Sequence, residues 1–463
     1  MEPVKRKNLK EPIILTKLLD NSQLLVVDSK TTIRYFDPKN LDVLDGFKGN
    51  INHLRYKTSV IAFSSEGEFF ATISADSKES RLYNATTKKA IAKVGRHQGE
   101  VSCVGIDKTS QYMFSCGDDG KTFAIDIKSG KLAFTLPVHI DTVNDIAFSA
   151  NGNWVATASY DKKVHLFNLS MMTPKHKFKS HSAPVMKLAF LTNSRILSID
   201  KDSNAIIWNI YSAKILQRLE GVHDDVTQVC TSKNGKFLFL GTSLGYVILY
   251  DLDTYEQLSK KYIKLSTSIT SMEFLEEGNQ LILGCENGDL LFYDIFEGEA
   301  ELKDLFKKKQ YEEIQKKADI NPLLAYTKLY KLVDNLWEKT LAQAIICLQN
   351  NDKKTAVALF KNFKNSPQKN KIMQKVILEY EDYDKFLTFA KAGKIPLAYN
   401  LANIHPMYKD SKVYKSLEAR WQKAFVTAQK YSLDPKGIDK AKEVLAPYRG
   451  LSEKTKLIQE LLT

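Results

Sequence analysis

Seven evenly spaced repeats, a change of hydrophobic period near Ala300 and a change of charge at the same place predict a chain of two domains. The first is a seven-bladed β-propeller over residues 1–298, and the second is an all-α, solenoid-like domain of helical hairpins over residues 299–463. The length of 463 residues agrees with two domains, because single hydrophobic cores stop growing near about 250–300 residues.

The repeats are marked by an aromatic or apolar residue followed by Asp or Asn at the end of an apolar strand. The pairs are Phe36-Asp37, Tyr83-Asn84, Ile125-Asp126, Phe167-Asn168, Trp208-Asn209, Tyr250-Asp251 and Tyr293-Asp294, spaced by 47, 42, 42, 41, 42 and 43 residues. Alternating apolar runs and turn residues within each repeat predict four short strands. Seven such units close into a propeller without a long exposed sheet edge.

The last blade needs a fourth strand from elsewhere, because the chain turns helical soon after Tyr293-Asp294. We therefore expect Val4–Lys10, inside a clasp segment 1–11, to pair into blade seven as its outer strand. The alternative is that residues 297–302 form this strand.

These repeats resemble the WD-repeat family, in which each blade carries a Gly-His element, a turn Asp and a Trp-Asp pair. The matching residues are His97, His139, His181 and His223 for the His element, Asp119, Asp161 and Asp202 for the turn Asp, and Trp208 for the tryptophan. Leu244 and Asn287 replace the turn Asp in blades six and seven. The resemblance implies that these histidines bind the turn acids and hold the blades together.

The resemblance also implies that partners bind the face carrying the turns between the second and third strands. The residues expected to point outward there are Asp118, Tyr160 and Lys201, with Glu100 and Asp225 in nearby loops between blades. Tyr160 is the expected anchor, because an exposed tyrosine offers a large contact area at a small entropic cost.

From about Ala300 the apolar spacing changes to 3.6 residues, which predicts helices. Asn321-Pro322 predicts a helix start, and later breaks separate helices of ordinary length. One apolar stripe per helix and short connections predict stacked hairpins. The alanine-containing segments loosely resemble tetratricopeptide-type repeats without a clean 34-residue period. The order of domains is similar to that of vesicle-coat and intraflagellar-transport subunits.

The net charge of +13 is concentrated in the second domain. Residues 1–300 hold 36 Lys and Arg against 35 Asp and Glu, whereas residues 301–463 hold 31 against 19. Such asymmetry favours an acidic partner for the helical domain, whether protein, nucleic acid or a membrane surface. The lysine runs at 307–309 and 316–317 are also typical of an ordinary solvated face.

No catalytic, cofactor or metal site is expected. The sequence holds no GxSxG, HExxH, phosphate-binding glycine loop or DxDxDG loop, and residues 117–120 fit a turn of the repeat. The five cysteines form no CxxC pair, so they are interpreted as small apolar residues. The charged N-terminus and the lack of a long apolar stretch predict a cytoplasmic protein with no membrane span.

The sequence therefore predicts a non-enzymatic protein-interaction scaffold within a multi-subunit assembly. The propeller face would bind one protein, and the basic helical domain would dock another or self-associate. The alternative is a nucleic-acid- or ribosome-associated factor that uses the helical domain. A propeller hydrolase or lyase would need convergent acids or metal ligands, which the repeats do not supply. The partner, the pathway and the oligomeric state are not encoded in a recognisable pattern.

Overall fold

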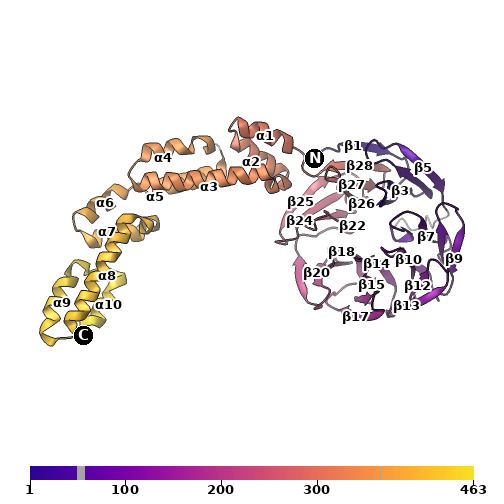
Figure 1. Cartoon of the computed structure of the whole chain (residues 1–463), viewed down its shortest axis with the longest axis horizontal. Helices are drawn as coiled ribbons and strands as arrows, with labels where there is room; N and C mark the ends of the chain where they lie inside the picture. The colour runs from indigo at the N-terminus through magenta and orange to yellow at the C-terminus, as the bar shows by residue number, and fades with distance from the viewer. Residues whose placement is uncertain (50–57, 365, 463) are drawn as a thin grey trace. The chain divides into compact units, whose positions relative to one another are not determined.

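The computed structural model describes residues 1–49, 58–364 and 366–462 (Figure 1). The chain divides into two compact units, Met1–Glu297 and Gly298–Thr463. Strands make up most of the first unit, and helices make up the second. Among the described residues, no helix is both long and apolar enough to cross a membrane.

The first unit is a ring of seven four-stranded antiparallel sheets, which confirms the predicted propeller. Blade one consists of β2 (Ile13–Leu18), β3 (Leu24–Asp28), β4 (Thr32–Phe36) and β5 (Val43–Lys48). Blade two consists of β6 (Ile61–Phe63), β7 (Phe69–Ile73), β8 (Ser80–Asn84) and β9 (Ala90–Val94). Blade three consists of β10 (Val101–Ile106), β11 (Tyr112–Gly117), β12 (Thr122–Asp126) and β13 (Leu132–Thr135). The short helix η1 (Thr58–Val60) precedes β6.

Blades four to seven follow the same order. Blade four consists of β14 (Val143–Phe148), β15 (Trp154–Ser159), β16 (Val164–Asn168) and β17 (Thr173–Phe178), and blade five of β18 (Val185–Phe190), β19 (Arg195–Asp200), β20 (Ala205–Asn209) and β21 (Ile215–Leu219). Blade six consists of β22 (Val226–Thr231), β23 (Phe237–Thr242), β24 (Tyr246–Asp251) and β25 (Gln257–Lys264). Blade seven consists of β26 (Ile269–Leu275), β27 (Gln280–Cys285) and β28 (Asp289–Asp294), and β1 (Lys5–Asn8) completes it.

Burial across a blade explains its sequence pattern. In blade four every residue of the second strand, β15, is buried, because this strand lies inside the sheet and between neighbouring blades. The outermost strand, β17, is mostly exposed and carries lysine and histidine. The predicted Asn151-Gly152 turn leads into β15, and Gly152 adopts φ +72°, a conformation that glycine reaches without strain.

The N-terminal strand expected over residues 4–10 is β1, which pairs antiparallel with β28. The side chain of Arg6 forms a two-point contact with Asp289, with nitrogen-to-oxygen distances of 3.1 and 2.8 Å. Lys5 reaches blade one, where its ammonium donates to the carbonyl of Pro38 at 2.8 Å. The alternative strand over 297–302 is excluded, because residues 299–307 form a helix.

The second unit consists of helices joined by short turns and short 3-10 segments. The α-helices are α1 (Glu299–Lys307), α2 (Tyr311–Ile320), α3 (Lys328–Gln349), α4 (Lys353–Leu359), α5 (Pro367–Glu379), α6 (Tyr383–Lys391), α7 (Ile395–Ile404), α8 (Lys412–Ser432), α9 (Ile438–Leu445) and α10 (Ser452–Leu462). The 3-10 segments are η2 (Pro322–Tyr326), η3 (Phe360–Phe363), η4 (Pro406–Asp410), η5 (Pro435–Gly437) and η6 (Ala446–Tyr448). The predicted start at Asn321-Pro322 is the start of η2, where the Asn321 side chain accepts from Leu323 N–H.

The helical unit contains two copies of one five-helix arrangement. The pairs α1 and α6, α2 and α7, and η2 and η4 begin and end 84 positions apart, and α3 and α8 begin at the same interval. The pairs α4 and α9, and α5 and α10, begin 85 positions apart. The long helices are capped alike, because Thr327 and Ser411 each accept a backbone N–H three residues ahead. The period of this unit is therefore much longer than 34 residues.

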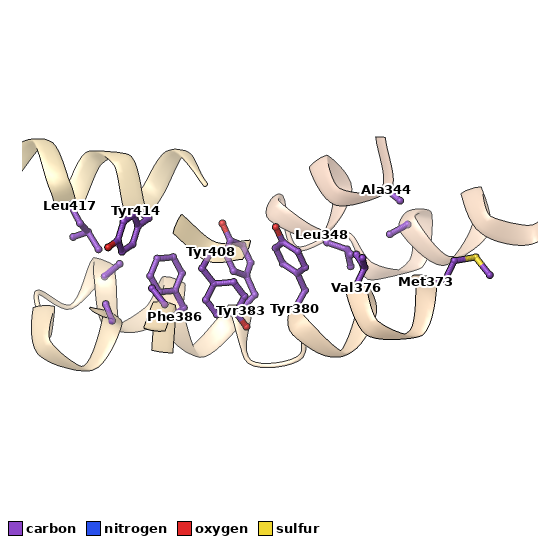
Figure 2. Close-up of a cluster of buried hydrophobic side chains, with 14 of the residues drawn as sticks. Ala344, Leu348, Met373, Val376, Tyr380, Tyr383, Phe386, Tyr408, Tyr414 and Leu417 are labelled. Carbon is purple, nitrogen blue, oxygen red and sulfur yellow. The ribbon is translucent and has the colours of Figure 1, made fainter. Parts of the chain in front are cut away.

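The interiors of the two copies also match. In each copy a buried lysine lies over a tryptophan ring and pairs with an acid: Lys369, Trp337 and Asp334 in the first, and Lys454, Trp421 and Glu418 in the second. The lysine-to-acid distances are 3.3 and 2.8 Å. An aromatic cluster joins the copies, with Tyr380 from the end of the first and Tyr383, Phe386 and Tyr408 from the second (Figure 2).

Candidate protein-binding face of the propeller

The turns between the second and third strands gather on one face of the propeller, which we call the turn face. One backbone bond recurs there, running from the first turn residue to the carbonyl just before the innermost strand. Its N–H donors are Asp118, Tyr160 and Lys201, which donate to the carbonyls of Glu100, Thr142 and Pro184 at 2.8–2.9 Å. The same bond links Ser243 to Asp225 at 3.0 Å. It places the five candidate residues at equivalent levels of their blades.

In blades three and four the predicted histidine and turn acid bind each other. His97 Nδ1 lies 3.0 Å from Asp119, and His139 Nδ1 lies 3.1 Å from Asp161. The second ring nitrogen of each histidine contacts a strand hydroxyl, on Ser115 in blade three at 3.0 Å. Burial opposes ionisation of Asp119 and Asp161, but bonds from the histidines and from backbone N–H groups hold the pKa of both carboxyls below its usual value.

In blade five the turn acid predicted at Asp202 does not bind the histidine. His181 Nδ1 lies 2.9 Å from Asp200, and Asp202 is exposed. Asp200 ends β19, two positions earlier, where its side chain reaches the buried ring and also caps the turn by accepting Asp202 N–H at 3.0 Å. The strand hydroxyl of this blade also binds the histidine, because Ser198 Oγ lies 2.7 Å from His181 Nε2. The same hydroxyl oxygen accepts a hydrogen bond from Trp208 Nε1 at 2.7 Å.

In blade six the predicted structural role of His223 is wrong, because this histidine is exposed. Leu244 stands where the turn acid would be, so a buried imidazole would find no carboxylate there. The neighbouring Asp224 binds the turn directly. Its carboxylate accepts the Ser243 hydroxyl and Leu244 N–H, each at 3.0 Å.

The five predicted surface residues are all exposed. Asp118, Lys201 and Asp225 line the mouth of a cavity of about 900 Å³, whose walls include Ser102, Asn144 and other residues of the innermost strands. Tyr160 and Glu100 do not line it.

Blade four presents a second apolar residue that sequence reasoning missed. Ile140 is 85% exposed, Tyr160 is 45% exposed, and both adjoin Asp161, since Ile140 N–H donates to its carboxylate at 3.2 Å. The signal in the sequence was an isoleucine directly after a repeat histidine, because the three other blades with this histidine have Gln98, Ser182 and Asp224 at that position. The turn face of blade four therefore carries an exposed apolar pair, Ile140 and Tyr160.

One cluster of possible metal ligands occurs among the described residues, formed by His139, Asp161 and His165. The two imidazole rings are stacked at 3.7 Å. His139 already uses both ring nitrogens, for Asp161 and for the Thr157 hydroxyl at 2.9 Å. A metal would have to break these bonds, so we assign the cluster a structural role.

Three segments of the propeller, residues 88–123, 130–168 and 172–209, match the family model described as "WD domain, G-beta repeat". The chain is 24% identical to Protein NEDD1 of Homo sapiens over 59% of its length, and 25% identical to WD repeat-containing protein 55 of Arabidopsis thaliana over 42%. It is 22% identical to a guanine nucleotide-binding protein subunit beta of Saccharomyces cerevisiae over 43%.

The matches span 41%, 56% and 49% of the three relatives, so about half of each relative is covered. The matched family model, the relatives and the seven four-stranded blades agree with one another. The chain is therefore a seven-bladed β-propeller with a C-terminal helical domain, and three segments of its propeller match the WD-repeat family model.

Proposed function

We propose that this chain is a non-enzymatic scaffold whose turn face binds a protein partner, while the helical domain docks a second one. The observation that carries the proposal is the exposed pair Ile140 and Tyr160 on blade four. An aromatic and an aliphatic side chain surrounded by charged residues is the usual composition of an interface centre and its rim.

Charged residues around the pair support the proposal. Asp141 follows Ile140 in sequence, and Asp118 and Lys201 occupy the equivalent turn positions of the two neighbouring blades. A partner could place an apolar anchor on blade four and polar groups on blades three and five. The relatives include proteins named as a subunit, the guanine nucleotide-binding protein subunit beta, and as a binding protein, the retinoblastoma-binding protein 5 homolog of Drosophila melanogaster.

A cytoplasmic location is part of this proposal. The cysteines of the chain are all free thiols, which suits a reducing compartment. Fractionation of cells expressing the tagged protein tests the location.

Site-specific photo-crosslinking in the full chain tests the binding face. A photoreactive residue at position 140 should capture a protein that the same residue at position 216 does not. Leu216 is the matched control, because it is also an exposed aliphatic residue but lies on β21, the outermost strand of blade five.

The captured protein is then purified and its affinity measured. Tyr160→Ala should weaken its binding by about 1–2 kcal/mol and leave the melting temperature unchanged. Equal capture from positions 140 and 216, or unchanged affinity of the Tyr160→Ala, Asp118→Ala and Lys201→Ala variants, would exclude the turn face as the binding surface.

A further inference from the structure

The duplication of the helical unit separates residues that serve packing from residues that serve the surface. Some residues that recur between the copies are buried, as with Ala344 and Ala428 or Trp337 and Trp421, and others are exposed, as with Ile320 and Ile404. The buried residues recur because the two copies pack their interiors in the same way. Exposed residues have no packing reason to recur.

Among the exposed residues that recur, three lysines lie at equivalent positions of the two long helices. They are Lys328, Lys331 and Lys339 in α3, and Lys412, Lys415 and Lys423 in α8. At 100° per residue the three positions lie within roughly 80° of one another around the helix and extend over about 16 Å of its length. Each helix therefore presents three lysines on one face, which we call the α3 stripe and the α8 stripe.

The stripes carry charge that the protein does not neutralise. Within the described residues none of the six lysines forms a salt bridge, whereas Lys316 and Lys317, which the sequence pattern had singled out, pair with Glu312, Glu313 and Glu301. The stripes also differ from the buried Lys369 and Lys454, whose acids lie within 3.3 Å.

Uncharged residues lie beside the lysines on the same face of each helix. On the lysine face of α3 these are Asn335 and Ala342, and on α8 they are Ala419 and Val426. The tryptophans of both helices are buried, so the stripes offer no exposed ring on which a nucleic-acid base could stack. They also contain no arginine, the residue best suited to two-point phosphate recognition.

We propose that the α3 and α8 stripes each bind an acidic segment of a polypeptide partner, so that the helical domain holds such a partner at two equivalent places. This inference rests on the proposed role of the helical domain as a docking surface. The α8 stripe binds more strongly, because α3 carries an acid, Glu338, at a position where α8 has the uncharged Gln422. Lys430 extends the α8 stripe where α3 has Ile346.

The test measures binding of a fluorescent poly-glutamate peptide of about 20 residues to the full chain at low salt. One variant is K328Q/K331Q/K339Q, a second is K412Q/K415Q/K423Q, and a third combines both. The control is K353Q/K354Q/K361Q, which removes the same charge from exposed lysines that do not recur, since Ile438, Asp439 and Ala446 stand at the equivalent positions.

Each stripe variant should weaken binding about fivefold or more and the combined variant about 20-fold or more, with the α8 variant the more damaged of the two. The control should change affinity less than about twofold, and calorimetry should find two peptides per parent chain. The proposal is overturned if the control loses as much as a stripe variant, if the combined variant binds like the parent, or if a 20-nucleotide oligo(U) binds more tightly than the peptide.

The same assay separates this proposal from the function of the propeller. Tyr160→Ala should leave poly-glutamate binding unchanged, because it alters only the turn face. Loss of capture at position 140 with intact poly-glutamate binding would remove the propeller proposal alone. Specific capture at position 140 without binding of poly-glutamate would refute the stripe proposal alone.

Discussion

Removal of residues 1–10 should destabilise the whole propeller, because β1 completes blade seven. The deletion breaks the β1 to β28 ladder and two flanking backbone bonds, Val4 N–H to Phe292 at 2.7 Å and Leu9 N–H to Gly288 at 2.8 Å. It also removes Arg6, which leaves the nearly buried Asp289 without its cation. At about 1 kcal/mol per net hydrogen bond and about 1–3 kcal/mol for the charged contact, the loss is roughly 4–6 kcal/mol.

A loss of that size is a large part of the stability of a typical domain, which is about 5–15 kcal/mol. Calorimetry of the full chain should show a lower melting temperature, and hydrogen exchange should show faster exchange across β27 and β28. Arg6→Ala alone should cost about 1–2 kcal/mol, because Asp289 keeps its bond from Asn8 at 2.8 Å. An unchanged melting temperature with β28 still protected after the deletion would refute this account of ring closure.

Three further outcomes are expected. Asp161→Ala should lower the melting temperature by depriving the buried His139 of its partner, whereas Tyr160→Ala should not; equal effects on thermal melting would contradict this division. Burial and the nearby His139 lower the pKa of His165 to about 4. As the pH falls from about 6.5 to 4, His165 therefore takes up a proton in the unfolded chain but stays neutral in the folded blade. The free energy of unfolding should fall by up to about 3 kcal/mol over this pH range. Urea titrations should show a smaller fall for the His165→Phe variant. Proteolysis within 297–303 should release a folded propeller, and the failure to recover a stable fragment near 300 residues would argue against separable domains.

Much of the architecture is legible in the sequence. Each blade can be recognised from the residue pair that ends its third strand, because strand alternation and turns depend only on residues close together in the sequence. The missing last strand could also be located, since ring closure leaves an edge that some other segment must cover. The start of η2 was readable because an asparagine followed by proline has a local capping role.

Side-chain partners were less predictable. Asp200 and Asp202 are two positions apart, and both lie near the turn of blade five. Only the direction of each side chain decides that the first binds His181 and the second points to solvent. In the same way, His223 matches the repeat in sequence but has no turn acid to bind, since Leu244 occupies that place.

Taken alone, the sequence determined the number of blades, the N-terminal closing segment, the onset of the helices and the concentration of positive charge in the second half. The tertiary structure decided which acid meets which histidine and that Ile140 is exposed beside Tyr160. It also identified which residues of the 84-residue duplication are interior and which are lysines exposed on one face. The physical reason is range: strand and helix patterns arise from neighbours in the chain, whereas a contact, an exposed pair or an equivalent surface depends on how residues far apart are brought together.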